Sequence, residues 1–248
     1  MILLIDSGNT RTKWVLAENW QFLSEVGGVL NEDVESSDLL NVAKQTSHIY
    51  VANVAGELMQ TRLKALLGNI AMTFVRSSEA ACGVINQYQQ ANRLGVDRWL
   101  SMLAAHEICK NSCLVVNAGT ALTIDALSFD AEQQNAQFIG GVIVPGLRLM
   151  QQALNANTAQ LPKADGIYVP FAKNTADAIH TGCMLALLGA IQLQWQNLYD
   201  VVKITPQILI SGGDALELKN NLAIDLAKHS IIVDNLVLRG LMRLERDM

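Results

Sequence analysis

Two short segments of the 248-residue chain have the residue types of a phosphate-binding turn. The first runs from Asp6 to Lys13 and follows the apolar run Ile2 to Ile5. Gly8 lets backbone N–H groups approach an anion closely, Thr10 adds a hydroxyl donor, and two basic residues follow. Asp6, at the end of the strand, would hold Mg²⁺ through water. Taken alone, the segment also fits an ordinary hairpin turn.

A second copy of this pattern follows the apolar run Cys113 to Val116. The segment ILLIDSGNTRTKWVL matches CLVVNAGTALTIDAL: each has a buried strand, a turn with Asp or Asn, a small residue, glycine and a hydroxyl residue, and a second strand. The period is about half the chain, which favours a duplicated domain over a solenoid. We therefore expect two halves, residues 1–112 and 113–248. Two equivalent turns suggest a nucleotide whose phosphates are held from both sides.

A third glycine cluster, from Ser211 to Asp214, follows the expected strand Gln207 to Ile210. Two glycines between a strand and a helix suit the close approach of a ligand part such as adenosine. The alternative is a helix start capped by Asp214. Neither GxxxxGK[ST] nor GxGxxG occurs, so the P-loop and Rossmann fingerprints are absent.

The segment GVDRW, residues 95–99, opens an expected helix with a carboxylate and a guanidinium. Asp97 would accept a hydroxyl proton, with Arg98 beside it to bind an anionic substrate. A phosphoryl transfer needs such a base and little other covalent chemistry. Asp97 is also a favoured residue type for the first turn of a helix, so capping is the alternative interpretation.

The elements that must position these residues follow from hydrophobic periodicity. Strands are predicted at 2–5, 12–17, 21–26, 48–54, 70–75, 113–116, 121–124, 138–144, 207–210 and 231–233. Helices are predicted at 36–45, 57–67, 96–109, 147–154 and 175–198, after Asp214, and at 236–246. Two β-β-β-α-β-α units facing one another would leave a cleft between them, with both polar turns directed into it.

Composition excludes several classes of protein. Half of the residues are hydrophobic, which is incompatible with a disordered chain. The net charge of −5 comes from 18 basic and 23 acidic side chains, so nucleic acid is not an expected partner. Aromatic residues make up only 5%, too few for stacking platforms along a single strand.

Targeting signals and membrane spans are not expected. The N-terminus lacks a positive leader, and the longest apolar tract, Gly182 to Ile191, is well below the roughly 20 residues of a membrane span. Four cysteines without a CxxC pair predict a reducing, cytoplasmic location. The spacing of His106, Cys109 and Cys113 is a weak metal pattern without a fourth ligand. The apolar stripe from Met184 to Leu193 is expected to lie in the core or at a subunit interface.

Five ordered motifs together resemble those of type III pantothenate kinases, including the related Bvg accessory factor proteins. They are DSGNT at 6–10, GVDRW at 95–99, NAGTALTID at 117–125, GGVIVPG at 140–146 and NTADAIHTG at 174–182. The resemblance implies an α/β fold of duplicated ribonuclease H-like domains, of the acetate and sugar kinase/Hsp70/actin type with an interdomain cleft. It also implies a homodimer that uses ATP and Mg²⁺ to phosphorylate pantothenate at the start of coenzyme A synthesis.

The resemblance also assigns residues to the substrates. The first ATP phosphate loop would consist of Asp6, Ser7, Gly8, Asn9, Thr10, Arg11, Thr12 and Lys13, with Thr120 contacting ATP from the second turn. Asp97 would be the proton acceptor. The pantothenate pocket would be lined by Tyr88, Gly95, Val96, Asp97, Arg98 and Thr175, and completed by the partner subunit.

One residue departs from the family pattern. Type III pantothenate kinases commonly have Asp at the head of the second loop, where it binds a monovalent cation, and this chain has Asn117. Loss of a carboxylate weakens an oxygen-ligand site, so activation by K⁺ or NH₄⁺ is expected to be weak or absent. Two other functions remain open: phosphorylation of another small hydroxyl compound, and nucleotide binding by a regulatory accessory protein of the same fold.

Overall fold

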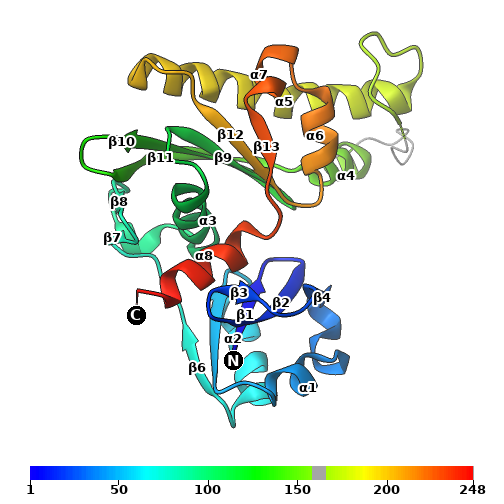
Figure 1. The fold of residues 1–248 in the computed structure, drawn as a ribbon. Coiled ribbons are helices and arrows are strands. Elements are labelled where there is room, and N and C mark those ends of the chain that lie inside the picture. Colours follow the sequence, from blue (N-terminus) through cyan, green and yellow to red (C-terminus); the bar gives the residue numbers. More distant parts are fainter. Residues whose placement is uncertain (158–165, 248) are drawn as a thin grey trace. The chain divides into compact units, whose positions relative to one another are not determined.

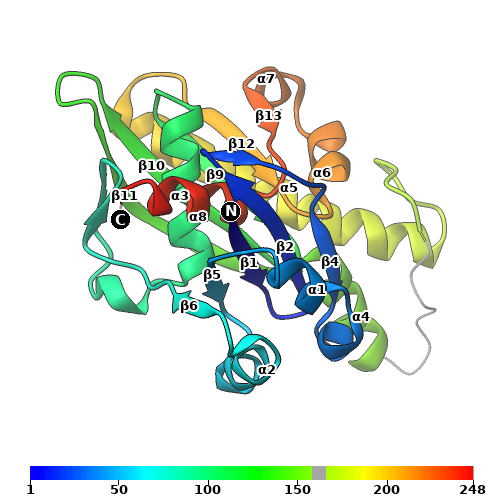
Figure 2. The ribbon, with the colours of Figure 1, turned by 60° about the horizontal axis from the view of Figure 1, so that its bottom comes forward.

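The computed structural model describes residues 1–157 and 166–247, which form two compact units (Figures 1 and 2). Unit 1 contains Met1–Ile108 together with Asn235–Met248, and unit 2 contains Cys109–Asp234. The predicted halves, 1–112 and 113–248, follow the internal repeat in the sequence. Division by packing places the boundary at Ile108 and assigns the C-terminal segment to unit 1.

Unit 1 is built on a mixed sheet with the strand order β3-β2-β1-β5-β6, in which β4 also pairs with β2. These strands are β1 (Ile2–Ser7), β2 (Arg11–Glu18), β3 (Gln21–Phe22), β4 (Gly27–Leu30), β5 (His48–Asn53) and β6 (Ala71–Phe74). β1 is antiparallel to β2 and parallel to β5. A further short hairpin consists of β7 (Ala80–Ala81) and β8 (Val84–Asn86).

The helices of unit 1 bury the apolar side chains of this sheet. They are η1 (Asn31–Ser36), α1 (Leu39–Ala43), α2 (Glu57–Leu67), η2 (Ala91–Arg93), α3 (Val96–Ile108) and α8 (Leu236–Glu245). Leu3, Ile5 and Val51 of the sheet pack with Leu63 of α2 in one buried cluster. α8 lies so close to α3 that a Cβ at Gly240 would be 2.0 Å from the Leu100 carbonyl oxygen. The packing therefore requires glycine there.

Unit 2 repeats this sheet with the strand order β13-β12-β9-β10-β11. The strands are β9 (Cys113–Ala118), β10 (Ala121–Asp130), β11 (Asn135–Pro145), β12 (Gln207–Ser211) and β13 (Ser230–Ile232). β9 is antiparallel to β10 and parallel to β12, as β1 is to β2 and β5. The series β1-β2-β4-β5-β6 thus has the same order and strand directions as β9-β10-β11-β12-β13, which is the topology of a duplicated domain.

The helices of unit 2 are α4 (Leu147–Asn157), α5 (Thr175–Val202), α6 (Ala215–Asn221) and α7 (Ile224–Lys228). α5, yellow in Figure 1, runs beside the sheet and buries Met184, Leu187 and Ile191 against it. It is longer than the predicted apolar tract and, by length and composition alone, could cross a membrane. Of the residues in its most apolar window, 44% are buried inside the protein.

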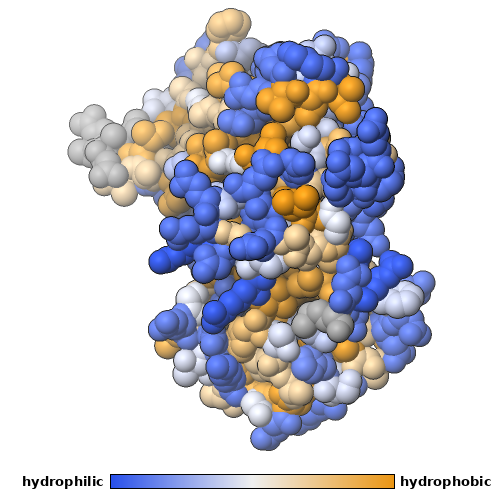
Figure 3. Space-filling view, turned by 90° about the vertical axis from the view of Figure 1, so that its left-hand side faces the viewer, coloured by the Kyte–Doolittle hydropathy of each residue, from blue (hydrophilic) through white to orange (hydrophobic). Residues whose placement is uncertain are grey.

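Apolar side chains also reach the surface. Figure 3 shows orange hydrophobic patches between the blue hydrophilic residues on one face of the molecule. The exposed apolar residues of unit 2 include Leu185 and Leu193 of α5 and Leu216 of α6. The high hydrophobic fraction of the chain is therefore only partly explained by its two cores.

Most predicted elements are present, and two of the differences lie near the N-terminus and in the middle of unit 1. The predicted strand 21–26 is wrong beyond Phe22, because the chain pairs again only at β4, which begins at Gly27. Gly27 lies against the Trp14 indole, where a Cβ would be 2.5 Å from a ring atom. The hairpin of β7 and β8 was not predicted, since its strands are too short to show alternation.

Candidate active site

The first polar turn joins β1 to β2 as predicted. Ser7 pairs with Thr12 at the end of the two strands, and the Gly8 N–H donates to the Arg11 carbonyl oxygen at 3.0 Å. Ser7 and Thr12 are fully buried, whereas Asn9 and Thr10 are exposed at the tip. The turn therefore offers its tip to a ligand while its base is fixed in the sheet.

Asp6 is the titratable group at the base of this turn. Burial and the negative charge of Asp97 raise the pKa of Asp6 from 3.8 to about 7, and the opposing charge of Lys13 lowers it. Lys13 is the residue paired with Asp6 across β1 and β2. Two carboxylates with one facing lysine form a negatively charged site, and such a site suits a divalent cation.

The two basic residues of the turn have different environments. The Arg11 guanidinium donates from Nη2 to the Gly28 carbonyl oxygen at 3.3 Å, which ties this exposed side chain to β4. Lys13 is half-buried and close enough to Asp6 to lower its pKa. Lys13 is thus the basic residue of the turn whose charge acts on the Asp6 carboxylate.

Asp97 lies in the first turn of α3, as the sequence predicts. Its Oδ1 accepts a hydrogen bond from the Arg98 N–H at 2.8 Å, so the carboxylate folds back toward the start of the helix. A Cβ at Gly95 would be 2.7 Å from this oxygen. The glycine before α3 therefore makes room for the Asp97 carboxylate.

The structure brings Tyr88 and Arg98 together. The Arg98 guanidinium carbon lies 5.9 Å from the centre of the Tyr88 ring, although Arg98 is buried and Tyr88 is exposed. The buried Asn86 accepts from the Tyr88 N–H at 3.0 Å and donates to the Ser78 carbonyl oxygen at 3.0 Å. Val96, also named by the sequence, is buried at the start of α3.

The second polar turn joins β9 to β10 in unit 2. The Gly119 N–H donates to the Ala121 carbonyl oxygen at 3.1 Å, and Thr120 is exposed at the tip. Asn117 is half-buried and pairs with Thr123 on one side and Ser211 on the other. Thr175 is an exposed residue at the start of α5, beside the N-cap Asn174.

Two glycines close the second turn from either side. A Cβ at Gly146 would be 2.1 Å from the Gly119 carbonyl oxygen, and one at Gly212 would be 2.1 Å from the Ala118 carbonyl oxygen. Gly212 also has a φ of +103°, which favours glycine. Asp214 stands at the N-cap of α6 but makes no capping hydrogen bond from its side chain. Close backbone approach, and not capping, accounts for this cluster.

Sequence reasoning did not identify Asn31, which contacts the first turn. Asn31, the first residue of η1, forms hydrogen bonds with Gly8 and Thr12. It belongs to no recognisable motif and lies far from the turn in sequence, so only the pairing of β2 with β4 reveals it.

Metal ligands do not form a cluster in the described part of the chain. No group of three or more His, Cys, Asp or Glu side chains there could hold a metal ion. The four cysteines are all free thiols.

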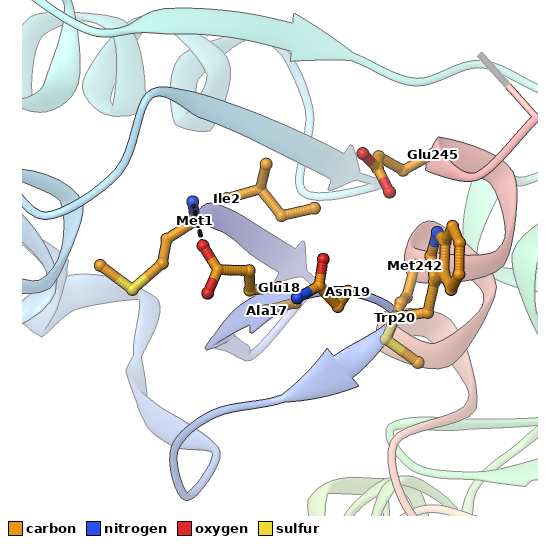
Figure 4. A pocket seen from close by; sticks show the side chains of 8 residues that line it. All are labelled: Met1, Ile2, Ala17, Glu18, Asn19, Trp20, Met242 and Glu245. Atoms are coloured by element: carbon orange, nitrogen blue, oxygen red, sulfur yellow. Dashed lines mark hydrogen bonds and ion pairs between the residues drawn. The ribbon is translucent and has the colours of Figure 1, made fainter.

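A pocket of about 270 Å³ in unit 1 lies at the other end of β1 (Figure 4). It is lined by Met1, Ile2, Ala17, Glu18, Asn19, Trp20, Met242 and Glu245. The Met1 ammonium group already pairs with Glu18 at 3.1 Å, as the dashed line shows. The pocket contains none of the residues singled out from the sequence.

The fold resembles that of solved kinases and related proteins. A conserved Campylobacter jejuni protein, described as a Baf family transcriptional activator, matches with a TM-score of 0.61 at 22% identity, over 99% of this chain and 98% of the other. A Sinorhizobium meliloti protein described as a 2-dehydro-3-deoxygalactonokinase matches with a TM-score of 0.60 at 12% identity, over 100% and 99%. These likenesses confirm the predicted class, a duplicated α/β ribonuclease H-like fold of the acetate and sugar kinase/Hsp70/actin type.

Sequence comparison is more specific. The family model described as type III pantothenate kinase matches residues 2–197. A type III pantothenate kinase of Aromatoleum aromaticum is 38% identical over 250 residues, which cover 100% of this chain and 98% of that protein. One of Methylobacillus flagellatus is 39% identical over 256 residues, which cover 100% and 98%. With these motifs and this fold, the chain belongs to the type III pantothenate kinase family.

Proposed function

We propose that this chain transfers the γ-phosphoryl group of ATP to the primary hydroxyl of pantothenate, giving 4′-phosphopantothenate for coenzyme A synthesis. Family membership supports the reaction. The observation that carries the assignment of residues is the placement of Asp97 at the start of α3, in the same unit as the first turn and within electrostatic reach of Asp6.

Asp97 acts as the general base. The hydroxyl oxygen of pantothenate forms a bond to the γ-phosphorus, and the bond from this phosphorus to the β,γ-bridging oxygen breaks. The hydroxyl proton passes to the Asp97 carboxylate, and ADP leaves with the bridging electrons. Because phosphoryl transfer requires mainly positioning and charge stabilisation, one base and two anion-binding turns are sufficient.

The first turn holds the ATP phosphates. The exposed backbone at the tip of this loop, Asn9 and Thr10, faces the anion, and Lys13 adds positive charge. Asp6 would hold Mg²⁺, which supplies neutralisation of the phosphate charge when bound. The raised pKa of Asp6 fits this role, because a divalent cation relieves the repulsion between Asp6 and Asp97.

The proposed pantothenate-binding residues of unit 1 are Tyr88 and the segment from Gly95 to Arg98. Pantothenate carries a carboxylate, and Arg98 supplies a buried guanidinium to bind it. The contact between Arg98 and the Tyr88 ring orients both side chains. Asn117 in place of the usual Asp weakens the monovalent cation site, so K⁺ or NH₄⁺ is a dispensable cofactor here.

A homodimer is supported by the exposed face of α5. One side of this helix carries small and apolar residues with little or no burial: Ala178, Gly182, Leu185, Ala186, Gly189 and Leu193. No Asp, Glu, Lys or Arg occurs between Asp177 and Asp200. Such a face is unfavourable in water and small residues let a second helix approach closely, so a second copy of α5 is the proposed occupant. The four free thiols fit a reducing cytoplasm.

The deciding experiment is ADP release with pantothenate, ATP and Mg²⁺, comparing wild type with Asp97→Asn. We expect turnover to fall by about 10²–10⁴-fold, with ATP affinity nearly unchanged, because the base is lost and the phosphate loop is intact. Asp225→Asn, which changes an exposed carboxylate of unit 2, is the matched control. Near-normal turnover of Asp97→Asn contradicts the proposed role.

The same assay separates the two other functions. ADP release with a different hydroxyl compound, and not with pantothenate, identifies another small-molecule kinase. ATP binding without ADP release from any acceptor identifies a regulatory nucleotide-binding protein.

A further inference from the structure

Asn31 contacts three backbone or side-chain groups of the first turn. Its Nδ2 donates to the Gly8 carbonyl oxygen at 2.8 Å, and its Oδ1 accepts from the Thr12 hydroxyl at 2.9 Å. Its backbone N–H donates to the Thr10 carbonyl oxygen at 3.0 Å. A single half-buried residue therefore fixes the turn along its whole length.

The direction of the hydrogen bonds follows from the number of protons available. The Thr12 hydroxyl has one proton and gives it to Asn31, so the Ser7 hydroxyl, 3.1 Å away, must be the donor to Thr12. The bonds run in one direction, from Ser7 through Thr12 and Asn31 to the Gly8 carbonyl. Hydrogen bonds in such a directed chain polarise and so strengthen one another. Ser7 and Thr12 are both fully buried, which strengthens these bonds further.

Holding the Gly8 carbonyl determines where the next N–H points. In a trans peptide the C=O and the following N–H point in opposite directions, and the chain has no cis peptide bond among its described residues. Because the Gly8 carbonyl oxygen faces Asn31, the Asn9 N–H faces away from it, at the exposed tip of the turn. An outward N–H at this position suits an anionic ligand.

We propose that Asn31 is the positioning residue of the first phosphate loop, holding the Gly8 carbonyl so that the Asn9 N–H is presented to the phosphates of ATP. This rests on the proposed function, since it deepens the assignment of the first turn as the phosphate loop. Asparagine is the side chain that fits: aspartate keeps the acceptor for Thr12 but has no donor for the Gly8 carbonyl, and alanine has neither.

The test compares Asn31→Asp and Asn31→Ala with wild type by MgATP binding, the KM values of both substrates, and thermal unfolding. For Asn31→Asp we expect about tenfold or greater weakening of ATP binding and a matching rise in the KM for ATP, because a carboxylate faces the Gly8 carbonyl and releases it. The KM for pantothenate should stay within about twofold, since the pantothenate residues are untouched. Asn31→Ala should weaken ATP binding in the same direction.

Gln45→Glu is the matched control. The Gln45 side chain also donates from an amide to a backbone carbonyl oxygen, that of Asn41, and the change also adds one negative charge to unit 1. ATP binding should be unchanged in this variant. Unchanged ATP binding in Asn31→Asp overturns the proposal. Equal weakening for both substrates, in proportion to a loss of thermal stability, also overturns it because that is the result of a purely structural role.

Failure of the proposed function gives a different result. If wild type binds MgATP but phosphorylates no pantothenate, the proposed function fails, and Asn31 is still judged by ATP binding alone. If wild type does not bind ATP, both proposals are wrong.

Discussion

Burial and the negative charge of Asp97 together raise the pKa of Asp6, which lies one residue before the end of strand β1, whereas Asp97 lies in the first turn of helix α3. The two carboxylates therefore interact within unit 1, and the charge of Lys13 lowers the pKa of Asp6 in opposition. This relationship links the stability of the unit to pH through a residue of the proposed site.

The pH dependence of unfolding should change in Asp6→Asn. The folded pKa of Asp6, about 7, lies above its ordinary value of 3.8. Between these values the folded chain holds a proton that the unfolded chain releases, so the stability contributed below about pH 4 is lost as the pH rises to 7. The variant has no such group, and its free energy of unfolding relative to wild type should rise by up to roughly 4 kcal/mol across this range. Denaturant unfolding without metal or nucleotide measures it, and a constant difference contradicts it.

Gly95→Ala should reduce turnover without unfolding the protein. The new Cβ would lie 2.7 Å from Asp97 Oδ1, and the carboxylate can move away more easily than the backbone. Misplacement of a base by about 1 Å can cost on the order of 100-fold in rate, so we expect a 10–100-fold lower kcat and little change in thermal unfolding. Adding Gly95→Ala to Asp97→Asn should have no further effect on kcat. Additive losses would show that Gly95 acts independently of Asp97.

Leu193→Glu should convert the proposed homodimer to a monomer. A charge on the exposed face of α5 would be buried without a partner between two subunits. Leu216→Glu is a closely matched control, because Leu216 of α6 is 63% exposed and Leu193 is 62% exposed. Light scattering coupled to size exclusion measures the mass. A wild-type monomer, or a dimer that persists in Leu193→Glu, contradicts this interface. Loss of the dimer in Leu216→Glu as well would show that the effect is not specific to the α5 face.

Replacement of Na⁺ by K⁺ should have little effect on the rate of the wild-type chain. Asn117 offers an amide oxygen where a carboxylate would bind the cation more strongly. Asn117→Asp should introduce a K⁺-dependent increase in rate, measured as ADP release at constant ionic strength. Strong activation of wild type by K⁺ contradicts the expectation.

Cys109 should be the most reactive of the three buried thiols, Cys109, Cys113 and Cys183. A hydrogen bond from the Cys113 thiol lowers the pKa of Cys109, while burial raises the pKa of Cys183. Thiolates react with iodoacetamide faster than thiols do, so Cys109 should be alkylated before the other two near pH 7. Cys113→Ala removes the donor and should slow this reaction, as mapped by mass spectrometry. Labelling of Cys183 before Cys109 contradicts the prediction.

Local patterns predicted most of the fold and the residue types of the candidate site. The strand before Asp6, the helix that begins with Asp97 and its neighbours, and the repeated turn at Asn117 all follow from short stretches of sequence. The sequence could not reveal Asn31, because its contacts with Gly8 and Thr12 depend on the register of β2 and β4. The close approach of Gly212 to Ala118 likewise depends on the pairing of distant strands.

The place of α8 in unit 1 was also beyond sequence reasoning, and it bears on synthesis of the chain. Unit 2 is continuous from Cys109 to Asp234, whereas unit 1 needs both Met1–Ile108 and the segment that begins at Asn235. Because Gly240 packs directly on Leu100, α3 stays partly uncovered until α8 has left the ribosome. The unit that is translated first is therefore completed last, and part of its apolar surface stays exposed until the end of synthesis.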